Sequence, residues 1–329
     1  MRSPADERAQ WCASIRSAMN EAVQATAPVT ISTWMLLEHA GPWPVRGFPD
    51  DLDEATRRVL ESAEARGVRV QLIRRVRERR RTLRTVVVAG RGGERGWAER
   101  REMADLAELA ALDLDALAAG TPPGFGEAVA AAEPVVLVCT HGRRDVCCAR
   151  LGRPVAVRLD AALPGQVWET THIGGDRFAA NVVTLPGGNY HGGLTSDDAP
   201  RMAAAVRAGE LVLDRWRGEC GMPAEEQAAA YFVRAELDEP RVGAVRAVPL
   251  TTDALTSPAR PEADVRVVAG GPGESVVRVR RVALDPRRTS CAEGGTIGAP
   301  AAYELVSLRR TPGSTAAPAA PAAQGSESG

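Results

Sequence analysis

The stretch VVLVCTHGRRDVCCARLG, residues 135–152, joins an apolar run to a polar loop and a second apolar pattern. The run VVLV predicts a buried strand with Cys139 at its carboxyl end, where open α/β sheets hold their ligands. The loop leads to Cys147 and Cys148 at the start of a predicted helix, whose free backbone N–H groups favour a thiolate. The stretch therefore predicts a strand–loop–helix unit of an α/β fold, with both ends of the loop meeting at one point.

A second motif, THIGGDRFAAN (171–181), overlaps the end of a predicted strand, which closes with His172. Its two glycines permit a tight turn, so the side chains of His172 and Asp176 can face the same point as the cysteines. Thiolates combined with imidazole select zinc or an iron–sulfur cluster. The spacing of Cys139 and Cys148 matches neither a zinc-ribbon CxxC nor the common ferredoxin runs. The residues alone therefore leave a metal site and a set of buried helix cysteines both open.

Hydrophobic periodicity indicates two units of similar order along the chain. After a predicted helix over residues 1–28, the first unit has a strand at 30–38 and a helix that begins at Asp50 or Asp51 and ends at Ala65. Two strands and a helix from near Trp97 complete it. The order strand, helix, two strands, helix then occurs again after the hinge AAGTPPGFGEA.

We therefore predict an α/β fold with two tandem thioredoxin-like units, of which the first is degenerate. A Pro-started helix and several short alternating strands predict a small α+β appendage after them. The low-complexity end TPGSTAAPAAPAAQGSESG is typical of a disordered tail. The predicted boundaries are 1–120 and 131–220 for the two units, 221–310 for the appendage and 311–329 for the tail.

Composition excludes several chemistries. The chain has 329 residues and a formal net charge of −1, and every one of its 41 basic residues is arginine. Without lysine there is no P-loop lysine, no Schiff base to pyridoxal phosphate and no kinase-type lysine. The N-terminal segment lacks the apolar run of a signal peptide, so we expect a cytoplasmic protein. In that reducing compartment the six cysteines are expected to be thiols or metal ligands.

The motifs CTHGRRDVCC, THIGGDRFAAN with VVTLPGG, and TWMLLEHAGPWP together closely resemble the sucrase/ferredoxin-like family, over about residues 34–216. The resemblance implies thioredoxin-like ferredoxin domains and a [2Fe-2S] cluster held by two cysteines nine residues apart and two histidines four residues apart. Carried across, these ligands fall on Cys139, Cys148 and His172. The second histidine falls on Asp176, where this sequence departs from the pattern.

A carboxylate is a harder ligand than imidazole, so a cluster completed by Asp176 is expected to be more labile. Cys147 and His141 are the alternative fourth ligands. A further alternative is a site that has lost its metal. We expect a retained cluster in an electron-transfer protein rather than an enzyme. A thiol-dependent oxidoreductase and a structural zinc site made by the same residues are the alternatives.

The expected partner is a protein redox partner, with no nucleic acid and no membrane. The densest basic run, RRVRERRRTLR (74–84), lacks interleaved aromatic residues and lies in a near-neutral chain, which favours a solvated hairpin over a nucleic-acid site. Near the predicted cluster, Asn181 and Arg177 are candidate hydrogen-bond donors.

Overall fold

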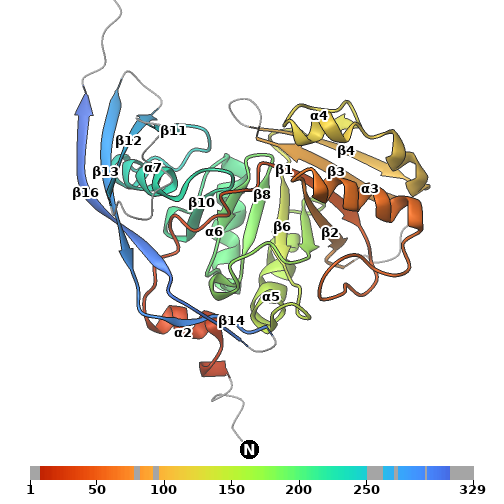
Figure 1. Cartoon of the computed structure of the whole chain (residues 1–329), viewed down its shortest axis with the longest axis horizontal. Coiled ribbons are helices and arrows are strands. Elements are labelled where there is room, and N and C mark those ends of the chain that lie inside the picture. Colours follow the sequence, from red (N-terminus) through yellow and green to blue (C-terminus); the bar gives the residue numbers. More distant parts are fainter. Residues whose placement is uncertain are drawn as a thin grey trace, which may run out of the picture.

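The computed structural model describes residues 8–77, 82–91, 96–249, 262–269, 273–292 and 295–311. Its centre is a large, curled, mixed sheet of ten strands in the order β10-β9-β8-β6-β7-β2-β1-β3-β4-β5, with helices packed on its faces (Figure 1). The strands are β1 (Thr33–Glu38), β2 (Arg69–Arg75), β3 (Arg84–Gly90), β4 (Trp97–Met103), β5 (Glu127–Ala128), β6 (Val135–Cys139), β7 (Val167–Thr170), β8 (Val182–Leu185), β9 (Asn189–His191) and β10 (Trp216–Glu219).

The two halves of this sheet have the same connectivity. In the first, β1 pairs parallel with β2 and antiparallel with β3, which pairs antiparallel with β4. In the second, β6 pairs parallel with β7 and antiparallel with β8, which pairs antiparallel with β9. Antiparallel pairing of β2 with β7 joins the halves into one sheet. The α/β class is thus confirmed, and the finer assignment to thioredoxin-like units stays a prediction.

Each parallel pair is connected by a helix, as parallel strands require. These helices are α3 (Glu54–Ala65) and α5 (Val146–Ala162). The cap of α3 is Asp53, not Asp50 or Asp51 as expected, because its carboxylate accepts a hydrogen bond from the backbone N–H of Thr56 at 2.8 Å. The remaining helices of the second half and the short helices are α6 (Ala199–Ala208), α4 (Leu114–Ala118), η1 (Leu106–Ala111), η2 (Asp176–Phe178), η3 (Ser196–Asp198) and η4 (Leu213–Arg215).

Two expected helices are wrong. Residues 1–7 of the helix predicted over residues 1–28 lie outside the described part, and the rest holds the short helix α2 (Cys12–Ala18), after which Asn20 adopts a φ of 49° and the chain passes beside β10. There the backbone N–H of Thr26 donates to the carbonyl of Arg217 at 2.8 Å. The helix predicted from Trp97 is strand β4. Pairing with the free edge of strand β3, which is buried at every residue after Arg84, overrides the local pattern.

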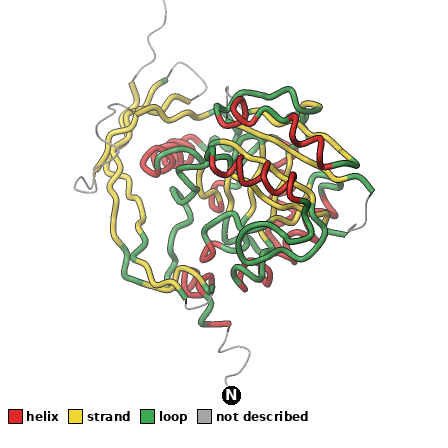
Figure 2. Tube along the Cα trace, turned by 45° about the vertical axis from the view of Figure 1, so that its right-hand side comes forward, coloured by secondary structure: helices red, strands yellow, loops and turns green. Residues whose placement is uncertain are grey.

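The C-terminal part has helix α7 (Ala224–Leu237) and a four-stranded antiparallel sheet in the order β11-β12-β13-β16. The C-terminal part also reaches the N-terminal region. Its long strands run along one side of the molecule to helix α2, near the N-terminus (Figures 1 and 2). The tail at 311–329 lies outside the described residues after Thr311. The strands are β11 (Val245–Pro249), β12 (Glu262–Ala269), β13 (Glu274–Ala283), β14 (Arg287–Ser290), β15 (Thr296–Gly298) and β16 (Ala301–Thr311).

The basic run at 74–84 begins in β2, where Arg74 pairs with the buried Glu169 of β7 at 2.5 Å. Residues 78–81 of this run lie outside the described part. Among the residues that the structure describes, no helix combines the length and the apolar character needed to cross a bilayer.

Helix α5 packs on β6 so closely that one of its residues has to be glycine. A Cβ atom on Gly152 would overlap the carbonyl oxygen of Cys139. Alanine favours a helix over glycine by about 1 kcal/mol, but here the clash forces the helix and the strand apart. We expect Gly152→Ala to lower the free energy of unfolding by about 1–3 kcal/mol, as overpacked cores do.

Urea unfolding of the purified variant measures this effect. Gly273→Ala is the control, because a Cβ atom there meets nothing within 4 Å. If Gly152→Ala is as stable as the natural protein, the close approach of α5 to β6 is wrong.

Candidate metal centre

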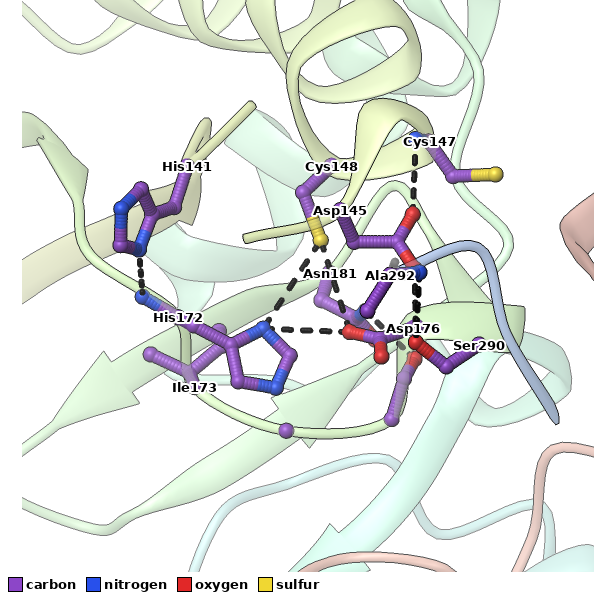
Figure 3. A network of polar contacts seen from close by, with 12 residues as sticks. His141, Asp145, Cys147, Cys148, His172, Ile173, Asp176, Asn181, Ser290 and Ala292 are labelled. Atoms are coloured by element: carbon purple, nitrogen blue, oxygen red, sulfur yellow. Dashed lines mark hydrogen bonds and ion pairs between the residues drawn. The ribbon is translucent and has the colours of Figure 1, made fainter. Parts of the chain in front are cut away.

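Four polar side chains converge at the carboxyl end of β6, and Figure 3 shows three of them, Cys148, His172 and Asp176. Ligand atoms of Cys139, Cys148 and His172 all lie within 4.8 Å of one another. The Sγ of Cys148 is 4.0 Å from Nδ1 of His172 and 3.9 Å from Oδ1 of Asp176. The same two atoms of His172 and Asp176 are 3.1 Å apart. Two thiols, an imidazole and a carboxylate therefore meet at one point.

The two cysteines are placed by the strand–loop–helix unit expected from the sequence. Cys139 ends β6 and its N–H donates to the carbonyl of Asn181 at 3.0 Å. Asp145 caps α5 by accepting a hydrogen bond from the N–H of Cys147 at 2.8 Å. The capped first turn then directs Cys148 back toward the end of the strand. Both sulfur atoms are buried.

The turn after β7 places the other two groups. Gly174 and Gly175 have φ values of 93° and 79°, which only glycine adopts without strain. The chain turns back at this point, so His172 and Asp176 face the same side. The side-chain amide of Asn181 donates to the carbonyl of Gly175 at 2.9 Å and so supports this turn, while a role as hydrogen-bond donor to a cluster stays a prediction.

Arg217, which no sequence motif indicates, holds this turn in place through hydrogen bonds. It is 2% exposed, and its guanidinium donates to the carbonyl of Gly174 at 3.1 Å and to Oδ1 of Asn181 at 2.8 Å. It also donates to the hydroxyl and the carbonyl of Thr26. Burial lowers the pKa of Arg217 to about 10, so it keeps its charge at neutral pH. No pattern near Arg217 signals this role, because its partners are distant in sequence.

The four groups perturb one another electrostatically. A hydrogen bond from Cys148 holds the pKa of Cys139 well below its usual value, and the same contact with burial raises the pKa of Cys148. Burial alone would lower the pKa of His172, but the Cys139 thiolate more than offsets it, so the net shift is upward. Burial raises the pKa of Asp176, partly offset by His172. The two shifts have opposite directions, and both favour negative charge on Cys139 and positive charge on His172.

The two alternative fourth ligands lie elsewhere. The ring of His141 packs edge-on against Trp43, and its Nδ1 accepts a hydrogen bond from the backbone N–H of His172 at 3.3 Å. The sulfur of Cys147 points away from Cys148, toward Cys12 and Cys291 (Figure 3). Of the candidates for the fourth position, the structure brings Asp176 to the other three groups.

The donor set fits a metal or an iron–sulfur cluster in its chemistry. Buried thiols and imidazole suit zinc and iron, and carboxylate is an acceptable, harder ligand of either. The donors also arrive in two pairs, the sulfurs from β6 and α5 and the other two from the turn after β7.

Comparisons with known proteins agree with the motifs. The model of a family described as sucrase/ferredoxin-like matches residues 14–218, more than half of the chain. A segment of 97 residues is 28% identical to altered inheritance of mitochondria protein 32 of Meyerozyma guilliermondii. That match covers 26% of this chain and only 34% of the relative's length. No solved structure matches.

Proposed function

The chain belongs to the sucrase/ferredoxin-like family, and from this premise we propose that it binds a [2Fe-2S] cluster and transfers electrons. The observation that carries the proposal is the convergence of Cys139, Cys148, His172 and Asp176 in one buried place. When bound, such a cluster supplies a one-electron redox couple. The repeated strand order of the two halves supports the inference that each is a thioredoxin-like unit, of which only the second keeps the ligands.

The surrounding residues suit a group that gains negative charge. The buried guanidinium of Arg217 is fixed behind the turn and stabilises negative charge at Cys148 and Asp176. Although burial disfavours the charged ring, Cys139 and Asp176 raise the pKa of His172, and a metal binds only the neutral imidazole, so any proton on His172 must leave when the metal binds. We therefore expect uptake of the metal to weaken as the pH falls.

Zinc is the second candidate occupant, favoured by one specific observation. The ligand atoms of Cys139, Cys148 and His172 lie within 4.8 Å of one another, a spacing compact enough to surround one ion. Thiol–disulfide exchange has less support, because a reactive thiolate needs access and Cys139 and Cys148 are 1% and 0% exposed. A protein redox partner and a cytoplasmic location stay predictions.

The test is anaerobic purification of the full chain, with ultraviolet–visible absorption and assays for iron, acid-labile sulfide and zinc. We expect visible charge-transfer absorption and about two iron and two sulfide ions per chain. Cys139→Ser should abolish both, and Cys220→Ser, at a buried cysteine outside the site, should keep them. Colourless protein without sulfide contradicts the cluster, and one zinc ion per chain lost in Cys139→Ser supports the second candidate.

Substitution of Asp176 tests whether it is the fourth ligand. Asp176→Ala removes one of four ligands, so we expect most of the iron to be lost on purification. Asp176→His supplies a second imidazole, and we expect a more firmly held cluster with a higher and more pH-dependent reduction potential. Iron assay and protein-film voltammetry measure both effects. Asp197→Ala, at an exposed carboxylate, is the control; iron retention in Asp176→Ala equal to that of the control would show that Asp176 is not a ligand.

A further inference from the structure

A second group of cysteines lies beside the first site, where three distant parts of the chain meet. Cys12 begins helix α2, Cys147 lies in the first turn of α5, and Cys291 follows strand β14. Figures 1 and 2 both show α2 and the C-terminal strands side by side at this end of the molecule. No sequence pattern signals this group, because its members are separated by more than a hundred residues each.

The sulfur atoms are spaced as ligands of one ion. The Sγ of Cys147 is 3.7 Å from that of Cys12 and 3.6 Å from that of Cys291. A disulfide bond is about 2.05 Å long, so these are contacts between free thiols. A tetrahedral zinc site with Zn–S bonds of about 2.3 Å has edges of about 3.8 Å between its sulfur atoms. The observed spacing therefore needs little adjustment to hold zinc.

The surroundings are those of a built site. Cys12 and Cys147 are fully buried in an apolar cluster with Ala13 and Ala179. Cys291 is half-buried and provides the open side, through which an ion and one water ligand can enter. One ligand atom of each cysteine and of Asp145 lies within 4.8 Å of the others.

Asp145 organises the group rather than filling the fourth position. One carboxylate oxygen accepts the hydrogen bond from the N–H of Cys147. The other accepts from the N–H of Cys291 at 2.6 Å and from the hydroxyl of Ser290 at 3.1 Å. The same carboxylate thus holds the backbone of two cysteines from distant parts of the chain, as outer hydrogen bonds do around metal ligands.

We propose that Cys12, Cys147 and Cys291 bind a zinc ion, with water as the fourth ligand, and that this ion fastens the N-terminal helix and the C-terminal strands to the start of α5. Binding converts three thiols to thiolates and releases three protons to solvent. The ion is separate from the proposed cluster, so the two proposals stand or fall independently. Because α5 carries both Cys147 and Cys148, the ion also secures the first turn of the helix at the first site.

The test uses the full chain carrying Cys139→Ser and Cys148→Ser, which lack the sulfurs of the first site. After removal of metal under reducing conditions, the protein is titrated with Zn²⁺ and, separately, with Co²⁺. We expect one ion per chain, a rise in the melting temperature and the sulfur-to-cobalt absorption of a thiolate site. Adding Cys291→Ser should weaken zinc binding more than the about 100-fold that loss of an outer hydrogen bond costs.

Cys220→Ser in the same background is the matched control, because Cys220 is buried outside both groups; it should bind zinc unchanged. Should the background protein fail to fold, the natural chain is compared with its single variant Cys291→Ser, which should hold one zinc ion fewer. Zinc binding that is equal with and without Cys291, binding of no ion, or a disulfide between any two of the three cysteines in freshly reduced protein would each overturn the proposal.

Discussion

Replacing Arg217 with methionine should lower the free energy of unfolding by about 3–5 kcal/mol, because it removes a buried charged donor from four acceptors that are buried or partly buried. These acceptors are the carbonyls of Gly174 and Thr26, the hydroxyl of Thr26 and the side chain of Asn181. Methionine keeps most of the apolar volume against the ring of Phe178, so the lost hydrogen bonds dominate. Urea unfolding measures the effect.

The same substitution should release the turn that aims His172 and Asp176. We therefore expect Arg217→Met to lose metal from the first site even at temperatures where the protein stays folded by circular dichroism. Arg58→Met is the control, since Arg58 forms an exposed ion pair with Glu54 on α3 that is worth less than about 0.5 kcal/mol. A loss of stability no larger than that of the control would refute the role of Arg217.

The second large effect is a loss of stability against unfolding at acidic pH. His191 of β9 is 1% exposed, and its Nε2 accepts a hydrogen bond from the N–H of Val212 at 3.3 Å. Burial lowers the pKa of His191 to about 3, and the opposing charges of Asp214 and Arg201 change this little. The folded-state pKa of His191 lies below the unfolded value of 6.5. Between these two pH values the unfolded chain therefore binds a proton at this residue and the folded chain does not.

The stabilising contribution of neutral His191 is therefore complete above pH 6.5 and is lost as the pH falls toward 3. The slope is about 1.4 kcal/mol per pH unit, which accumulates to several kcal/mol. We expect His191→Gln, whose side-chain oxygen can accept the same hydrogen bond, to remove this slope. Unfolding free energies of both proteins between pH 4 and 7 test it, because the carboxylates contribute equally to both. Parallel curves would mean that His191 is not the group responsible.

Much of the second half of the fold followed from local patterns. An apolar run ending at Cys139, a helix that begins near Cys147 and a Gly-Gly turn each have short-range causes, and the structure has them where the sequence indicated. The helix expected from Trp97 failed for a non-local reason. Its residues have a mixed pattern, and the unpaired edge of β3 decides that they form a strand.

The sequence by itself indicated the family, the α/β class and three of the groups that converge at the first site, Cys139, Cys148 and His172, because each depends on residues close together in the chain. Only the tertiary structure decided that Arg217 supports the turn and that Asp176, rather than Cys147, faces Cys148. It alone brought Cys12 and Cys291 to Cys147. These contacts arise when long strands and the N-terminal helix pack onto the sheet, and the direction of a side chain in that packing depends on partners that no local pattern specifies.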